Sequence, residues 1–260
     1  MKINRIAAAL LGIAAVSTAA LTANASHSWS NYHWGTTVKP FTLQVLNSTV
    51  SNSNANWPAK LSTAASQWSN TAAAFNLTVS SYTNTSTARK RCTAVSGKIR
   101  VCNASYGNNG WLGLASINIS GSHITQGTAK MNDSYSSTWT SDSNEAAHVM
   151  CQEVGHTFGL GHTSEDGSTQ NTCMDYSSSP TSTAPNQHDA DQLAAIYNHL
   201  DSTNTYSTSS AASATPAQQA MAGQVPMGVR VTMGRNFEIW AAPDGRGGTW
   251  IHHVTLAPAR

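Results

Sequence analysis

The sequence predicts an α+β fold, and three observations lead to that prediction. Several short runs alternate apolar and polar residues with period two, which is the pattern of half-buried strands. Helix signals occur in separate stretches of the chain: a Pro suited to a first turn, a cluster of N-cap residues and one segment of helical spacing. The 260 residues, 40% of them hydrophobic, are enough to bury a core.

The first half of the chain supplies strands and one helix. Residues 41–46 alternate as a half-buried strand does, and a helix is expected from residue 56 to 68 because Pro58 suits its first turn. Further strands are expected at residues 75–79, 98–101, 112–119 and 123–131, the last two joined by a turn at Gly121-Ser122.

The second half begins with a predicted helix. Residues 141–143 beside Glu145 have N-cap character, so a helix is expected from there to about Phe158, where Gly159 and Gly161 end it. A Ser-, Thr- and Asp-rich loop runs on to Pro180. Residues 189–200 then form a closing helix by the spacing of their apolar residues.

Both ends of the chain differ from this central part. Residues 1–25 join a positive start, an apolar run and Ala23-Asn24-Ala25, which is the order of a bacterial secretory signal peptide cleaved after Ala25. An uncleaved membrane anchor is the alternative, but polar residues dilute its apolar run. We therefore expect a secreted protein with a domain at 26–201, a Ser/Thr/Ala-rich linker at 202–224, and a small β-hairpin-like tail of unknown role at 225–260.

Charge excludes one class of partner. Removing Lys2 and Arg5 with the signal leaves 12 basic residues against 12 acidic ones. Nucleic-acid binding calls for a basic patch, so no nucleic-acid partner is expected. We expect no membrane span in the mature chain, and a monomer.

Four cysteines remain in the mature chain, and an even number in an exported protein predicts disulfides. Three pairings are possible. We favour Cys92–Cys102, because the segment between them looks like a hairpin closed at its base, and this leaves Cys151–Cys173. In the tail, His252 and His253 are interpreted as a surface pair, since no third ligand is nearby in the sequence.

The segment at residues 151–162 carries the chemistry. Glu153, His156, Gly159 and His162 stand at the spacing E-x-x-H-x-x-G-x-x-H, and Cys173-Met174-Asp175-Tyr176 follows. The segment resembles the metzincin zinc proteases of matrixin or adamalysin type, whose pattern is H-E-x-x-H-x-x-G-x-x-H with a later Met-turn. The departure is Gln152, which stands at the first ligand position.

The resemblance implies a metzincin-like fold with a twisted mixed sheet, an active-site helix, a Met-turn and a closing C-terminal helix. It implies a secreted endopeptidase that cleaves protein or peptide substrates with metal-activated water and with Glu153 as general base. Zinc would be held by Gln152, His156 and His162, above Met174. One oxygen and two imidazoles also suit iron, manganese or cobalt. Tyr176 would steady the reacting oxyanion, and a Cys151–Cys173 bridge would tie the active-site helix to the Met-turn.

Three alternatives stay open from the sequence. His148 could replace the missing ligand, but it lies eight residues, or about 12 Å of helix, before His156, so a place at the rim is favoured. A free Cys151 could supply a thiolate ligand. The whole domain could also be a catalytically inactive metzincin fold that serves as a binding module at the cell surface or in the medium.

Overall fold

The computed structural model describes residues 27–141, 143–177, 179, 181–209 and 225–257. The expected signal peptide and residues 210–224 of the expected linker lie outside this part. The strands are β1 His33–Trp34, β2 Phe41–Ser48, β3 Phe75–Ser81, β4 Ile99–Ala104, β5 Trp111–Ser120, β6 His123–Asn132, β7 Val229–Met233, β8 Phe237–Pro243 and β9 Thr249–Leu256. The helices are α1 Trp57–Thr71, α2 Ser86–Arg91, α3 Ser136–Ser141, α4 Ser143–His156 and α5 Gln187–Ile196.

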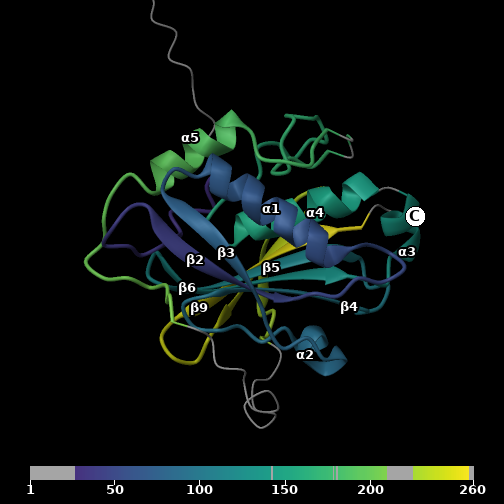
Figure 1. The fold of residues 1–260 in the computed structure, drawn as a ribbon, viewed down its shortest axis with the longest axis horizontal. Helices are drawn as coiled ribbons and strands as arrows, with labels where there is room; N and C mark the ends of the chain where they lie inside the picture. Colours follow the sequence, from purple (N-terminus) through teal and green to yellow (C-terminus); the bar gives the residue numbers. More distant parts are fainter. Residues whose placement is uncertain (1–26, 142, 178, 180, 210–224, 258–260) are drawn as a thin grey trace, which may run out of the picture.

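All these strands form one mixed sheet, in the order β3-β2-β4-β6-β5-β9-β8-β7, with β1 paired to β6. The first four are parallel, whereas β5 runs antiparallel to β6 and the remaining strands continue antiparallel. Helices α1 and α4 contact each other and lie on the same face of the sheet, as Figure 1 shows. The prediction of an α+β fold with a mixed sheet is confirmed.

Local signals explain where two of the predicted helices, α1 and α5, begin. The Asn56 side chain accepts a hydrogen bond from the Ala59 N–H, and Pro58 follows at the start of α1. Asn186 caps α5, and Asp189 bonds back to the Asn186 N–H in a capping box. This box starts α5 earlier than expected, and the helix ends at Ile196, which leaves Leu200 55% exposed instead of packed.

Two short helices, α2 and α3, were not predicted. Cys92 caps the end of α2 and is bonded to Cys102 on β4, so this disulfide joins a helix to a strand. The pairing Cys92–Cys102 is confirmed, but the expected hairpin between the two residues is wrong. The second predicted bridge, Cys151–Cys173, is also present.

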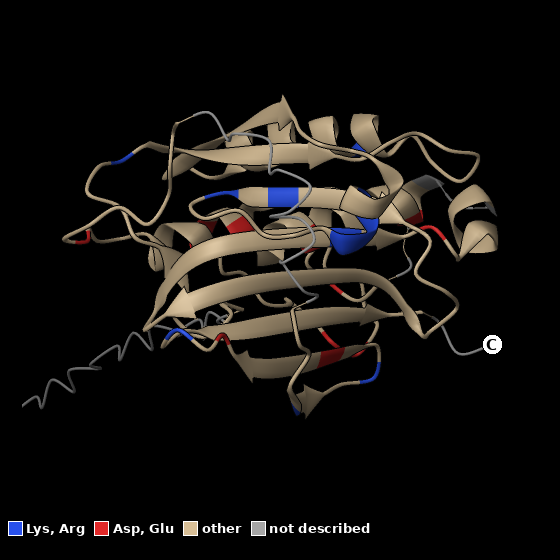
Figure 2. Cartoon of the chain, turned by 90° about the horizontal axis from the view of Figure 1, so that it is seen from below, with Lys and Arg blue, Asp and Glu red and all other residues tan. Residues whose placement is uncertain are grey.

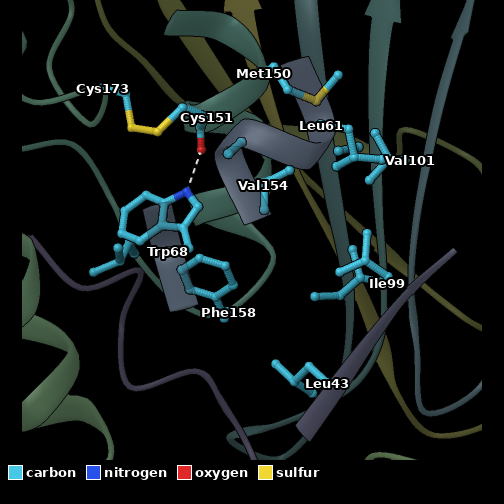
Figure 3. Packing of buried hydrophobic residues seen from close by; sticks show 14 of the residues in the cluster. Leu43, Leu61, Trp68, Ile99, Val101, Met150, Cys151, Val154, Phe158 and Cys173 are labelled. Atoms are coloured by element: carbon cyan, nitrogen blue, oxygen red, sulfur yellow. Dashed lines mark hydrogen bonds between the residues drawn. A yellow bond between two sulfur atoms is a disulfide. The ribbon is translucent and has the colours of Figure 1, made fainter. Parts of the chain in front are cut away.

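The core lies between the sheet and the two helices α1 and α4. Figure 3 shows Trp68 of α1 and Phe158 packed below α4, with Val154 beside them and Leu43, Ile99 and Val101 rising from the sheet. The Trp68 indole N–H donates to the Cys151 carbonyl at 3.0 Å, which fixes α1 to α4 in an otherwise apolar layer. This packing holds α4 rigidly above the sheet.

The strands of the tail belong to the same sheet as the rest. Strand β9 pairs antiparallel with β5 from Trp111 to Ile119, so the yellow strands in Figure 1 continue the sheet beyond β5. Residues 202–209, expected in the linker, instead run along the domain. The Thr205 N–H bonds to the Gly35 carbonyl, and the Tyr206 ring stacks on Phe41.

Charged groups are sparse and spread over many elements, as the coloured segments of Figure 2 show. No helix among the described residues is both long and apolar enough to cross a bilayer.

Candidate active site

Helix α4 carries the first part of the site. Glu153 and His156 are three residues apart on the helix and are both fully buried. The chain then turns at Gly159, whose φ is 102° and where a Cβ would overlap the Tyr32 carbonyl oxygen, so only glycine fits. This turn brings His162 back to His156, with 4.9 Å between their ring centroids.

A third histidine comes from the tail. Strand β9 places His253 opposite Ala115 of β5, and the ring centroid of His253 lies 3.9 Å from that of His156 and 4.4 Å from that of His162. One ring nitrogen from each of these three histidines lies within 4.8 Å of the other two. The interpretation of His252 and His253 as a surface pair is therefore wrong, since the two residues are 1% and 2% exposed.

The pleat of β9 explains this arrangement. Side chains alternate between the two faces of a strand, so His253 and Thr255 point to the face that α4 covers, whereas His252 points to the other face. There, the His252 Nδ1 lies 2.8 Å from the Ser116 hydroxyl. In a strand at residues 249–256, one of the adjacent residues His252 and His253 must point to the covered face of the sheet. Together with a motif that lacks one ligand, this was the sequence signal that could have identified His253.

The hydrogen bonds of the three histidines leave free nitrogens. The His156 Nδ1 lies 2.8 Å from the Leu160 carbonyl, which makes Nδ1 the donor and leaves a lone pair on Nε2. The His253 Nε2 lies 3.3 Å from the Tyr176 hydroxyl. Three buried nitrogens then have no partner among the described residues: His156 Nε2, His162 Nε2 and His253 Nδ1.

Burial also keeps these rings neutral. It lowers the pKa of His156 to about 4 and, together with the neighbouring histidines, lowers the pKa values of His162 and His253 well below the ordinary value. Neutral imidazoles with unpartnered lone pairs are the form in which histidine binds a metal. The site is therefore chemically suited to zinc, which takes imidazole ligands in tetrahedral sites.

Gln152 is engaged elsewhere. Its Nε2 donates to the Cys173 carbonyl at 3.0 Å and to the Asp175 carbonyl at 2.9 Å, and its Oε1 accepts from the Thr255 hydroxyl at 3.0 Å. Since two carbonyls can be satisfied only by a donor, the orientation of this amide is fixed. Gln152 thus joins α4 to the loop at residues 173–175 and to β9.

The Glu153 carboxyl lies against β5, where Gly113 leaves the room it needs: a Cβ there would overlap Glu153 Oε1. The same oxygen lies 2.6 Å from the Thr255 hydroxyl, and Glu153 Oε2 has no partner among the described residues. Burial raises the pKa of Glu153 to about 8, although the Thr255 hydroxyl and the Ala115 N–H act in the opposite direction. Thr255 has one hydroxyl hydrogen to donate to Gln152 Oε1 or to Glu153 Oε1, so both contacts are hydrogen bonds only when Glu153 Oε1 carries a proton and donates it to the Thr255 oxygen.

Aromatic rings wall the three histidines. Trp29 packs edge-on against His156, with ring centroids 5.8 Å apart, and Tyr176 packs against His162 at 3.9 Å. Phe237 of β8 stacks on Tyr176. These rings take the place of water around the histidines, which strengthens electrostatic interactions inside the site.

The remaining predicted residues lie around this centre. Met174 is fully buried and contacts α4 at Gly155, where a Cβ would come within 2.5 Å of its sulfur. His148 lies in a cavity of about 270 Å³ together with Tyr176 and Thr255, which fits the predicted place at the rim. The structure thus brings Glu153, His156, His162 and Tyr176 close together, and it places His253 and Thr255, which sequence reasoning missed, beside them.

Comparison with known proteins agrees with this geometry. The protein-family model described as Matrixin matches residues 33–198, which is more than half of the chain. The match includes α4 and the loop that follows it and stops before the tail that carries His253. A comparison with curated proteins finds no match. The chain belongs to the matrixin family of zinc metalloendopeptidases.

Proposed function

We propose that the protein is an exported zinc endopeptidase whose metal is held by His156, His162 and His253. The observation that carries this proposal is the convergence of three buried, unpartnered imidazole nitrogens beside a buried carboxyl group. Zinc bound there lowers the pKa of a water molecule and polarises the carbonyl of the substrate. The expected signal peptide and the two disulfides support export.

In this proposal His253 takes the place that the family pattern gives to Gln152. All donors of the Gln152 amide face protein acceptors, and its oxygen accepts from Thr255. An imidazole nitrogen is also the better zinc ligand, because a neutral amide oxygen is a weak donor. Gln152 then has a structural role: it holds α4 against the Met-turn, formed by residues 173–176.

Glu153 is the proton carrier. Its unpartnered Oε2 takes the proton of the attacking water and gives it to the amine that leaves. Thr255 holds Oε1 and thereby orients the carboxyl group. Glu153 must be ionised for this step, and a zinc ion bound beside it would favour the carboxylate and oppose the effect of burial on its pKa.

Tyr176 is placed to stabilise the oxyanion. Burial raises its pKa well above the ordinary value, so the hydroxyl keeps its proton. That hydroxyl lies 3.3 Å from His253 Nε2, at the edge of the cavity that Thr255 also lines. A neutral phenol beside the metal centre can donate to a carbonyl oxygen as negative charge develops on it.

One observation favours a second candidate, a catalytically inactive matrixin domain that acts as a binding module. Strand β9 covers β5, and the groups of the site are buried beneath it. In the enzyme, peptides reach Glu153 through the cavity beside Tyr176 and Thr255, or through a second cavity of about 180 Å³ beside His162 and His253. In the binding module, peptides do not reach Glu153.

The test compares mature wild-type protein with the Glu153→Gln variant, both loaded with zinc and assayed on casein and on a library of quenched fluorescent peptides. Elemental mass spectrometry measures the zinc in each. The enzyme proposal expects equal zinc and a loss of at least about 100-fold in hydrolysis, which is the scale of general-base catalysis. A zinc-loaded wild type that is no more active than Glu153→Gln on every substrate would overturn the proposal and leave the binding module.

A further inference from the structure

A second cluster of histidines lies where the two ends of the matrixin domain meet. His33 stands on β1, His123 begins β6, and His199 and Asp201 follow α5. The Nε2 atoms of the three rings lie 3.4 Å (His33), 3.0 Å (His123) and 3.5 Å (His199) from one oxygen, Asp201 Oδ1. The Nε2 atoms of His33 and His199 are 3.2 Å apart. No residue of this cluster belongs to the active site described above.

The hydrogen bonds around the cluster aim lone pairs at its centre. The His33 Nδ1 lies 2.7 Å from the Asn31 carbonyl, so Nδ1 is the donor and a neutral His33 has its lone pair on Nε2. The His199 Nδ1 likewise faces the Asn198 side-chain oxygen at 3.1 Å. Two lone pairs that face a carboxylate oxygen repel it. A divalent cation among these three atoms, or a proton on a ring Nε2, would remove that repulsion.

The spacing of the atoms favours the cation. In a tetrahedral zinc site with bonds of 2.0–2.1 Å, ligand atoms are about 3.3 Å apart. The three separations among His33 Nε2, His199 Nε2 and Asp201 Oδ1 are 3.2, 3.4 and 3.5 Å. Outer contacts hold the ligands in place as they do in metal sites: the Asn31 carbonyl orients His33, and the Thr36 N–H donates to Asp201 Oδ2 at 2.8 Å.

We propose that His33, His199 and Asp201 form a second divalent-metal site of the zinc class, with His123 beside the carboxylate as the fourth available ligand. His199 and Asp201 lie beyond residue 198, where the match to the family ends, so the family pattern does not carry this site. A cavity of about 400 Å³, which these four residues help to line, gives an ion access.

The site would act as a clamp. His33 precedes the first long strand, and Asp201 follows the last helix of the domain, where its N–H also bonds to the Thr36 carbonyl. A metal bound by both ends stabilises only the folded chain, and a site filled by protein ligands leaves no position for substrate. The role is therefore structural and independent of peptide hydrolysis.

The test measures zinc per chain and the zinc-dependent rise in Tm of the mature protein. His199→Asn is the main variant, because the His199 side chain is 46% exposed and its replacement leaves the core intact. Asp201→Asn is the second variant, since its amide oxygen can still accept from Thr36. Asp191→Asn is the matched control: the same substitution at an exposed position of α5.

Wild type and Asp191→Asn are expected to bind one zinc more than His199→Asn and Asp201→Asn. At a free zinc concentration 100-fold above the Kd of this site, zinc bound here should raise the Tm of wild type and Asp191→Asn by about 5–10 °C. His199→Asn and Asp201→Asn should lack this rise. A His162→Ala background separates this site from the active centre: it should keep one zinc, which His199→Asn then removes. Equal zinc in wild type and in both cluster variants would overturn the proposal and leave a cluster neutralised by protons.

Discussion

Replacing His253 and Gln152 by alanine, one at a time, is expected to separate metal binding from stability. In the proposed site His253 is a ligand, whereas Gln152 supports the loop at residues 173–175. His253→Ala should therefore weaken zinc binding strongly. Gln152→Ala should leave zinc binding nearly unchanged and should lower the stability of the metal-free protein.

Both magnitudes follow from the contacts. Gln152 makes three buried hydrogen bonds of 2.9–3.0 Å, and each contributes about 1 kcal/mol. Their loss should lower the free energy of unfolding by about 3 kcal/mol and Tm by about 6–12 °C. Removing a residue that only hydrogen-bonds to a metal ligand lowers metal affinity by about 10–100-fold. Removing the ligand His253 itself should therefore lower zinc affinity by more than about 100-fold.

The assay titrates zinc against a chromophoric chelator and follows thermal unfolding of the metal-free proteins. His252→Ala is the matched control, because it removes a buried histidine from the same strand on the opposite face. The control should bind zinc like wild type. The reasoning is refuted if Gln152→Ala weakens zinc binding as much as His253→Ala does, since the amide would then be the ligand.

Three further predictions concern the removal of metal, the hydrogen exchange of β9 and the dependence of stability on pH. Removal of metal by a strong chelator should abolish hydrolysis while the near-ultraviolet circular dichroism persists, because two disulfides and an apolar core hold the fold; loss of that signal at 25 °C would contradict this. Zinc at 100-fold its Kd should slow hydrogen exchange of the β9 amides by about 100-fold, because β9 must leave β5 to release His253; equal slowing in His253→Ala would contradict this. Burial lowers the pKa of His27 to about 4, although the Gly161 carbonyl acts in the opposite direction. The Asp189 carboxyl oxygen Oδ1 lies 3.5 Å from His27 Nε2, but burial raises the pKa of Asp189. At low pH a protonated Asp189 therefore does little to stabilise a positive charge on His27. The unfolded chain takes up the His27 proton from about pH 6.5 downward and the folded chain only near pH 4, so on the order of 3 kcal/mol of stability should be lost across that window. His27→Gln should flatten the dependence of unfolding free energy on pH, and parallel curves for variant and wild type would contradict this.

The long elements could be predicted because their signals are local. Alternation predicted β2, the turn at Gly121-Ser122 separated β5 from β6, and Pro58 beside Asn56 predicted the start of α1. The short helix α2, with the sequence STARKR, has no apolar periodicity and depends on its contact with β4. Pattern reasoning therefore had no signal for it and instead gave a hairpin at the Cys92–Cys102 bridge.

In the candidate site too, some residues could be predicted from local sequence and one could not. The positions of Glu153, His156 and His162 relative to one another follow from helix geometry and one glycine turn, so their spacing in the sequence was sufficient. The contribution of His253 depends on the pairing of β9 with β5, which joins segments far apart in the chain. No local pattern determines such a pairing, so the sequence predicted the third ligand within the motif, at Gln152.

In the proposed site, a ligand on β9 changes how the metal centre is built. Helix α4 and the turn that follows it hold His156 and His162 ready, but the third nitrogen is present only while β9 is paired with β5. Metal binding and docking of the tail are then linked, so each must strengthen the other by the same factor. The same strand also carries Thr255, which holds Glu153, and it covers the edge of β5. A peptide therefore cannot pair with that edge of β5 while the metal centre is complete, and substrates must approach Glu153 from the cavities on either side of β9.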